Sequence, residues 1–140
     1  MRRHLPVALL VPVTLLVAGL ALSFGGSAAH ADCAASKNDF EDVYCYAKIY
    51  IDSDNDLNAA YKALTAKLDA NAKSVLKKSQ LAWMKSRNDD CGQTDSDGYY
   101  VDLSCAVDYT RNRTQFLRDR KAECDAGKCD LDALSKNEKP

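Results

Sequence analysis

Three aspartates, Asp52, Asp54 and Asp56, alternate with small polar residues, as they do at the head of a calcium-binding loop. Such a loop needs glycine at its sixth position for a sharp turn and glutamate at its twelfth to bind the ion through both oxygens. Counted from Asp52, those positions hold Leu57 and Ala63. We therefore predict no metal site here. The aspartates fit a helix start, where the backbone amides favour negative charge, or a charged kink within one long helix.

The residues that most often perform catalysis are scarce beyond the N-terminus of this chain. Both histidines, His4 and His30, lie in the first 31 residues, so the rest has no Ser-His or Cys-His pair and lacks the commonest ligand for transition metals. The glutamates are Glu41, Glu123 and Glu138, and the seventeen aspartates are scattered along polar faces. No carboxylate stands out as a buried acid. We predict that the protein is not an enzyme and binds neither metal nor cofactor.

Residues 1–31 have the features of a secretory signal peptide. Arg2 and Arg3 precede a long apolar run, and the Ala-His-Ala sequence at 29–31 is a cleavage site of the A-x-A type. We expect cleavage before Asp32, a periplasmic or secreted protein, and no stable membrane anchor after cleavage. The apolar run is also about long enough to span a bilayer, so an uncleaved anchor is the alternative.

The remaining residues, 32–140, suit one domain. They contain 17 Lys and Arg against 20 Asp and Glu, which leaves a net charge of −3. A mildly acidic chain has no general attraction to nucleic acid or to anionic lipid, whereas a basic partner attracts it weakly. We expect a helical domain over 32–124. Residues 125–140 form a polar C-terminal tail with one further cysteine, and we expect this tail to be mobile beyond that cysteine.

Six cysteines follow the predicted cleavage site, and an even number in a short exported domain predicts disulfides. The first choice is pairing between nearest neighbours, and crossed pairing among the first four is the alternative. The last two lack the C-x-x-C spacing of a redox or metal clip, so a structural clasp on a tight turn is favoured. The six are Cys33, Cys45, Cys91, Cys105, Cys124 and Cys129.

Apolar residues recur at helical spacing in three stretches, roughly 37–50, 57–91 and 103–121. The second changes phase near Asn71 with no glycine or proline to mark a turn, and Cys91-Gly92 is typical of a helix end. These stretches predict an all-α fold, a small disulfide-stapled bundle of three to four helices. The apolar stripe of the first stretch consists of Phe40, Val43, Tyr44, Ala47, Tyr50 and Ile51.

Residues 92–102, GQTDSDGYYVD, are predicted to be a loop between the last two helices. Glycine permits a sharp turn, the tyrosines offer flat contact area with a polar tip, and the aspartates supply negative charge. The loop is either an ordinary solvated connection or a binding projection. The candidate binding residues are Asp95, Asp97, Gly98, Tyr99, Tyr100 and Asp102.

Several short motifs resemble the LprI-type lysozyme-inhibitor domain family: DC after the signal, YC, DLNAAYKAL, QLAWMKSRNDDC and TRNRTQFL. The resemblance covers about residues 33–120. Cys124 and Cys129 are additions to the family pattern, and the lipoprotein cysteine of some members is missing. The matching positions outside the cysteines include Asn58, Tyr61, Gln80, Trp83, Arg87, Thr110 and Arg113. We expect these seven residues to form a structural network that holds the helices in register, and the alternative is that they bind a partner.

The resemblance implies an exported bacterial protein that binds and inhibits a lysozyme-type partner. Animal-type lysozymes are strongly basic, so a mildly acidic inhibitor gains association rate from the charge contrast. The 92–102 loop is the best candidate for a projection that fills the enzyme's cleft, and replacing both Tyr99 and Tyr100 with alanine should weaken inhibition strongly. The alternative function is an envelope domain that binds a cell-wall component or another envelope protein without inhibiting lysozyme.

Overall fold

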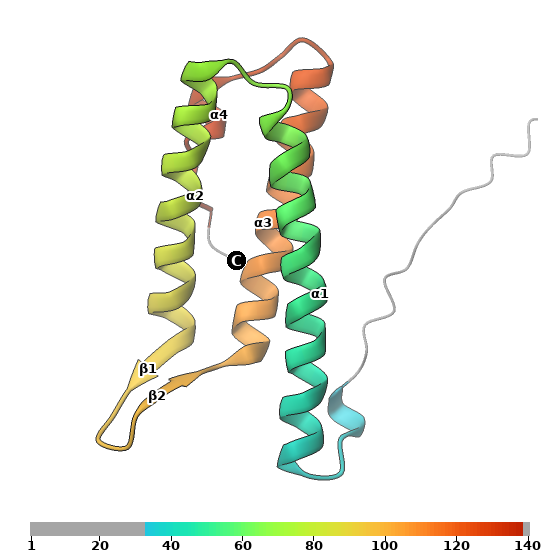
Figure 1. The fold of residues 1–140 in the computed structure, drawn as a ribbon, viewed down its shortest axis with the longest axis vertical. Coiled ribbons are helices and arrows are strands. Elements are labelled where there is room, and N and C mark those ends of the chain that lie inside the picture. Colours follow the sequence, from blue (N-terminus) through green and yellow to red (C-terminus); the bar gives the residue numbers. More distant parts are fainter. Residues whose placement is uncertain (1–32, 139–140) are drawn as a thin grey trace, which may run out of the picture.

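The computed structural model of the chain describes residues 33–138 (Figure 1). Three long helices lie side by side, and a two-stranded antiparallel sheet connects the second to the third. The all-α prediction is confirmed. In chain order the elements are η1 (Cys33–Ala35), α1 (Asp39–Thr65), α2 (Ala70–Cys91), β1 (Gly92–Thr94), β2 (Tyr99–Val101), α3 (Leu103–Asp125) and α4 (Leu131–Leu134).

Each of the three long helices begins at a polar residue whose side chain accepts a hydrogen bond from a backbone amide in the first turn. Asn38 accepts from the amide of Glu41, Asp69 from that of Ala72, and Asp102 from that of Cys105. Such caps satisfy amides that have no partner within the helix. The change of phase noted near Asn71 is the turn between α1 and α2, and Asp69 marks it where glycine and proline do not.

The alternating aspartates at residues 52–56 lie inside α1, which is continuous through them. The helix-start interpretation is therefore wrong, and the single long helix is right. Asp54 accepts a hydrogen bond from Asn58 one turn later at 3.0 Å, and Asp56 pairs with Arg118 of α3 at 3.1 Å. Among residues 33–138, no group of three or more potential ligand side chains could hold a metal ion.

The core lies where α1, α2 and α3 face one another. Its largest fully buried apolar side chains are Trp83, Leu64, Leu76 and Leu117, and α3 packs mainly against α1. Leu134 of α4 is 1 % exposed and joins this core. We expected mobile chain beyond the last cysteine, but this part of the tail contains a packed turn of helix. The reason is that Leu134, in an otherwise polar segment, packs against the apolar core.

The first half of α1 departs from the sequence prediction. Phe40, Val43, Tyr44 and Ile51 were expected to form a core stripe, but all four are exposed. Figure 1 shows the reason: α1 extends well past the point where α3 begins, so this part of the helix has little to pack against. Helical spacing predicted the stripe, but it could not show that α3 would begin too far along α1 to cover it.

Three disulfides join the six cysteines, all of which lie in the described part of the chain, and each pairs nearest neighbours. Cys33–Cys45 fastens η1 to α1, and Cys124–Cys129 closes a turn after α3. In that turn Gly127 has φ of 75°, a conformation that favours glycine. Within the described residues, none of the helices is both long enough and apolar enough to cross a membrane.

Candidate functional site

The 92–102 segment is a β-hairpin that projects from one end of the bundle (Figure 1). Gly92 pairs with Val101, Gln93 with Tyr100, and Thr94 with Tyr99. We expected an irregular loop, and the structure forms short strands instead. The β-branched and aromatic residues at 99–101 suit a strand, and the glycine-containing turn lets the chain reverse.

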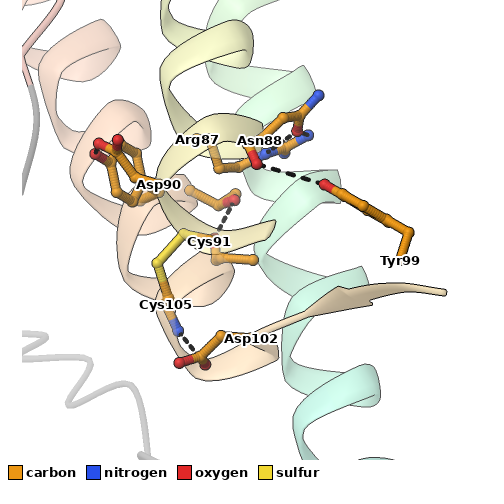
Figure 2. Close-up of a disulfide and its surroundings, with 10 residues drawn as sticks. Arg87, Asn88, Asp90, Cys91, Tyr99, Asp102 and Cys105 are labelled. Atoms are coloured by element: carbon orange, nitrogen blue, oxygen red, sulfur yellow. Dashed lines mark hydrogen bonds between the residues drawn. A yellow bond between two sulfur atoms is a disulfide. The ribbon is translucent and has the colours of Figure 1, made fainter. Parts of the chain in front are cut away.

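Contacts between the end of α2 and the start of α3 fix the base of the hairpin, where its two strands leave the bundle (Figure 2). The Cys91–Cys105 disulfide joins the end of α2 to the first turn of α3, with the two Cα atoms 5.5 Å apart. The amide of Asp102 donates to the carbonyl of Cys91 at 2.8 Å, and the Asp102 carboxylate accepts from the amide of Cys105 at 2.9 Å. Asp102, a candidate binding residue, thus caps α3. These links reduce the entropy that the hairpin would lose on binding a partner.

The tip of the hairpin is organised by Asp95. One of its carboxylate oxygens accepts from the amides of Asp97 and Gly98, at 2.8 and 3.2 Å, and its own amide donates to the Gly98 carbonyl at 3.0 Å. Gly98 has φ of 151°, which side chains disfavour. Asp95 and Gly98 therefore shape the turn, and Asp97 remains an exposed carboxylate at its tip.

The two tyrosines of the hairpin differ in their surroundings. The Tyr99 hydroxyl donates weakly to the Asn88 carbonyl at 3.4 Å (Figure 2). The ring also crosses Gly92 so closely that a Cβ there would lie 2.0 Å from the hydroxyl oxygen, so Gly92 is needed for this approach. Tyr100 follows in the strand and points to the opposite face. Tyr99 is 60 % exposed and Tyr100 46 %, so both rings are available for contact.

A groove of about 320 Å³ separates the hairpin from α1. The Arg87 guanidinium forms part of its wall and lies 5.7 Å from the Tyr50 ring centroid and 5.1 Å from that of Trp83. These contacts hold a cation beside aromatic faces. The groove is lined by Tyr50, Arg87, Asn88, Cys91, Gly92, Tyr99, Val101, Leu103 and Ala106.

Negative charge is concentrated at this end of the molecule. Residues 89–102 contain five aspartates and no lysine or arginine. Residues 39–56, the first two thirds of α1, contain six acidic residues and a single lysine. Figure 1 shows that both segments lie at the same end of the bundle. A local excess of one charge attracts an oppositely charged partner more strongly than the modest net charge of the chain suggests.

Arg113, one of the seven expected network residues, is 1 % exposed in the middle of α3. Its guanidinium donates to Gln80 Oε1 at 3.0 Å, to Ser79 Oγ at 2.8 Å and to the Lys136 carbonyl at 3.0 Å. Burial lowers the pKa of Arg113 to about 10. Because this pKa is still well above 7, the guanidinium remains charged at neutral pH. The cation therefore ties α2, α3 and the C-terminal segment together.

Ser79 and Lys136 take part in this network although the sequence analysis did not single them out. The Ser79 hydroxyl donates to the Lys136 carbonyl at 2.6 Å while it accepts from Arg113. Ser79 could have been suspected, because it lies between apolar positions on the inner face of α2. A backbone carbonyl in the tail has no sequence signal of its own.

The other expected network residues are dispersed. Trp83 is in the core with Arg87 against its ring, and the Thr110 hydroxyl bonds within α3 to the carbonyl of Ala106. Tyr61 is half-buried. Asn58 is exposed, and its side chain donates a hydrogen bond to Asp54, one turn earlier in α1. The structure therefore brings Gln80 and Arg113 into direct contact and leaves Asn58 apart.

Tyr109 is a further residue that the sequence analysis missed. It is 6 % exposed on α3, and its hydroxyl donates to the Asp90 carboxylate near the base of the hairpin. Burial, together with the hydrogen bond and negative charge of Asp90, raises the pKa of Tyr109 to about 12. The contact adds a second link between the end of α2 and α3.

The raised pKa of Tyr109 predicts a loss of stability at alkaline pH. The fold favours the neutral phenol, so its contribution is complete below the unfolded-state pKa of about 10 and is lost as pH rises towards 12. From about pH 9.5 to 11.5, the wild-type free energy of unfolding should fall more steeply than that of Tyr109→Phe. Urea titrations of both proteins measure this, and parallel pH profiles would contradict the assignment.

The comparisons with known proteins give one match. The model of a family described as "Lysozyme inhibitor LprI" matches residues 31–117. The matched range includes the hairpin, Arg113 with its partners Ser79 and Gln80, and the first two disulfides, and it ends before Cys124, Cys129 and Lys136. No curated protein and no solved structure matches the chain.

Proposed function

This chain belongs to the LprI lysozyme inhibitor family, and on that premise we propose that its 92–102 hairpin enters the substrate cleft of a lysozyme and excludes the polysaccharide. We further propose that the protein acts outside the cytoplasm, after removal of residues 1–31. Its three disulfides support this location, because such bonds persist in oxidising compartments.

The observation that carries the proposal is the braced, projecting hairpin itself. The Cys91–Cys105 disulfide and the Asp102 contacts hold its base, and Asp95 holds its tip. An inhibitor that fills a cleft must keep its shape there, since ordering a loose segment on binding weakens affinity. Tyr100 then offers an exposed ring at low entropic cost, as tyrosines do in many interfaces.

The charge of this end supports a basic partner. A strongly basic lysozyme would be drawn to the aspartates of the hairpin and of α1 before contact is made. The cleft of such an enzyme contains two carboxyl groups. We therefore assign Asp97 to the basic rim of the cleft and the Tyr100 ring to its sugar-binding floor, because a carboxylate placed beside those carboxyl groups would be repelled.

Replacing Tyr100 with alanine is expected to raise the inhibition constant by roughly thirtyfold, as the loss of an interface tyrosine worth about 2 kcal/mol would do. The protein is produced with its own leader, purified from the periplasm and assayed against a basic animal-type lysozyme. Leu81→Ala, which removes another exposed apolar side chain on the outer face of α2, is the matched control and should inhibit as the wild type does.

Two further measurements sharpen this test. Asp97→Asn and added salt should both slow association while changing dissociation little, because they act on charge steering. Tyr99→Ala is a poor substitute for Tyr100→Ala, since Tyr99 also packs on Gly92 and bonds to Asn88. If micromolar wild-type protein slows no lysozyme, the occlusion proposal is wrong. Binding to peptidoglycan fragments would then favour an envelope-binding role.

A further inference from the structure

The exposed stripe on the first half of α1 is a second surface with the features of a binding site. Phe40 is 79 % exposed, Tyr44 60 %, and Val43 and Ile51 58 % each. Helical spacing places Phe40, Tyr44 and Ile51 together on a face of α1 turned away from the buried Ser53 and Leu57. Val43 lies at the edge of this face that is nearer to Leu57. Together these four residues form an apolar strip roughly 16 Å long. A solvent-exposed face of a helix is usually polar, so a continuous apolar strip there indicates a contact surface.

This strip is rigid and ready for contact. The Cys33–Cys45 disulfide fastens η1 to the same part of α1, and Asn38 caps the helix just before Phe40. The Phe40 and Tyr44 rings are stacked, with centroids 6.4 Å apart and planes 7° from parallel. A partner would therefore meet side chains that are already arranged, which lowers the entropic cost of binding.

The charges around the strip select among possible occupants. By helical spacing, Asp39, Glu41, Asp52 and Asp54 flank it. Lys48, which lies 5.8 Å from the Tyr44 ring centroid, is the single basic residue between positions 39 and 56. Two copies of this surface would bring like charges together, and an anionic membrane would repel it. A partner with basic residues around an apolar strip would gain from both charge and burial.

We propose that this face of α1 docks a basic amphipathic helix of another protein, separately from the hairpin. A straight apolar strip about three turns long is the surface against which a second helix packs by fitting its side-chain ridges into grooves. The partner helix carries apolar residues at positions i, i+3, i+4 and i+7, with lysine or arginine on either side. The acidic residues of α1 pair with those basic residues at the rim of the contact.

The test uses the full-length gene product, purified from the periplasm, and a synthetic helical peptide with leucines at that spacing and lysines elsewhere. Titration calorimetry should show binding, and Phe40→Gln with Tyr44→Gln should weaken it at least tenfold. Glutamine keeps helix propensity, so the fold should survive, and circular dichroism confirms this. Leu81→Gln on α2 and Tyr100→Ala on the hairpin are the controls, and both should bind the peptide as the wild type does.

Three binding results would overturn the proposal. They are unchanged binding by the Phe40→Gln, Tyr44→Gln variant, equal binding of a peptide with glutamates in place of the lysines, and no binding of the lysine peptide at all. Sedimentation that detects a wild-type dimer lost in the double variant would also overturn it, in favour of a second copy as occupant. None of these results bears on lysozyme inhibition, which is measured separately, so the two proposals can fail independently.

Discussion

Replacing Arg113 with alanine is expected to lower the free energy of unfolding by about 3–5 kcal/mol, as breaking a buried charged network does. The substitution removes a cation that bonds Gln80, Ser79 and the Lys136 carbonyl, and it leaves a cavity beside the Phe116 ring, 4.3 Å from the guanidinium. The buried acceptors lose the donors that compensate for their removal from water. Denaturant titration followed by circular dichroism measures the loss.

Two comparison variants identify the cause. Arg118→Ala removes an exposed arginine of the same helix whose salt bridge to Asp56 is 3.1 Å long, and it should cost no more than about 1 kcal/mol. Arg113→Lys retains the charge but replaces the planar guanidinium, which reaches three acceptors, with a compact ammonium that cannot. Its free energy of unfolding should therefore lie between those of the wild type and Arg113→Ala. If Arg113→Ala costs no more than Arg118→Ala, the network does not stabilise the fold.

The same substitution should loosen the C-terminal segment. Lys136 is tied to the bundle through its carbonyl, and Leu134 is buried next to that contact. Without Arg113, the backbone amides of residues 134–136 should exchange with solvent faster, while those in the middle of α1 change less. Hydrogen exchange can therefore separate undocking of the tail from general loss of stability.

Trp83→Ala should also destabilise the protein by about 3–5 kcal/mol, the cost of deleting a large buried aromatic side chain. Trp83 is 1 % exposed and belongs to the main core, where a cavity would remain because the helices cannot fully collapse into it. Arg87, which rests on the Trp83 ring and lines the groove beside the hairpin, would lose its support as well.

Met84→Ala is the matched control, since Met84 is adjacent in sequence yet 40 % exposed, and it should change stability by well under about 1 kcal/mol. Trp83 is the only tryptophan, so unfolding must be followed by circular dichroism in all variants. A small effect of Trp83→Ala would mean that the QLAWMKSR motif serves binding more than packing.

Much of the fold could be predicted from particular residues. Helical spacing predicted the third long helix, Cys91-Gly92 marked the end of α2, and the even cysteine count indicated disulfides. The boundary between the first two helices was placed wrongly, because Leu57 and Leu64 belong to α1, which ends at Thr65. The motifs around Leu57, Trp83 and Arg113 pointed to the LprI family, which the family match confirms. The binding role of the hairpin residues stays a prediction, although the structure shows that Asp95 and Asp102 have structural contacts of their own.

The sequence by itself determined where helices can form, because helical spacing and polar caps act between residues that are neighbours along the chain. Tertiary structure decided which stripes are buried. Phe40 and Tyr44 are spaced like core residues but are exposed, since α3 begins beyond their reach, whereas Leu134 lies in a polar tail and is buried. Burial depends on which helices and side chains the rest of the fold places opposite a residue. The spacing of neighbouring residues along the sequence does not contain that information.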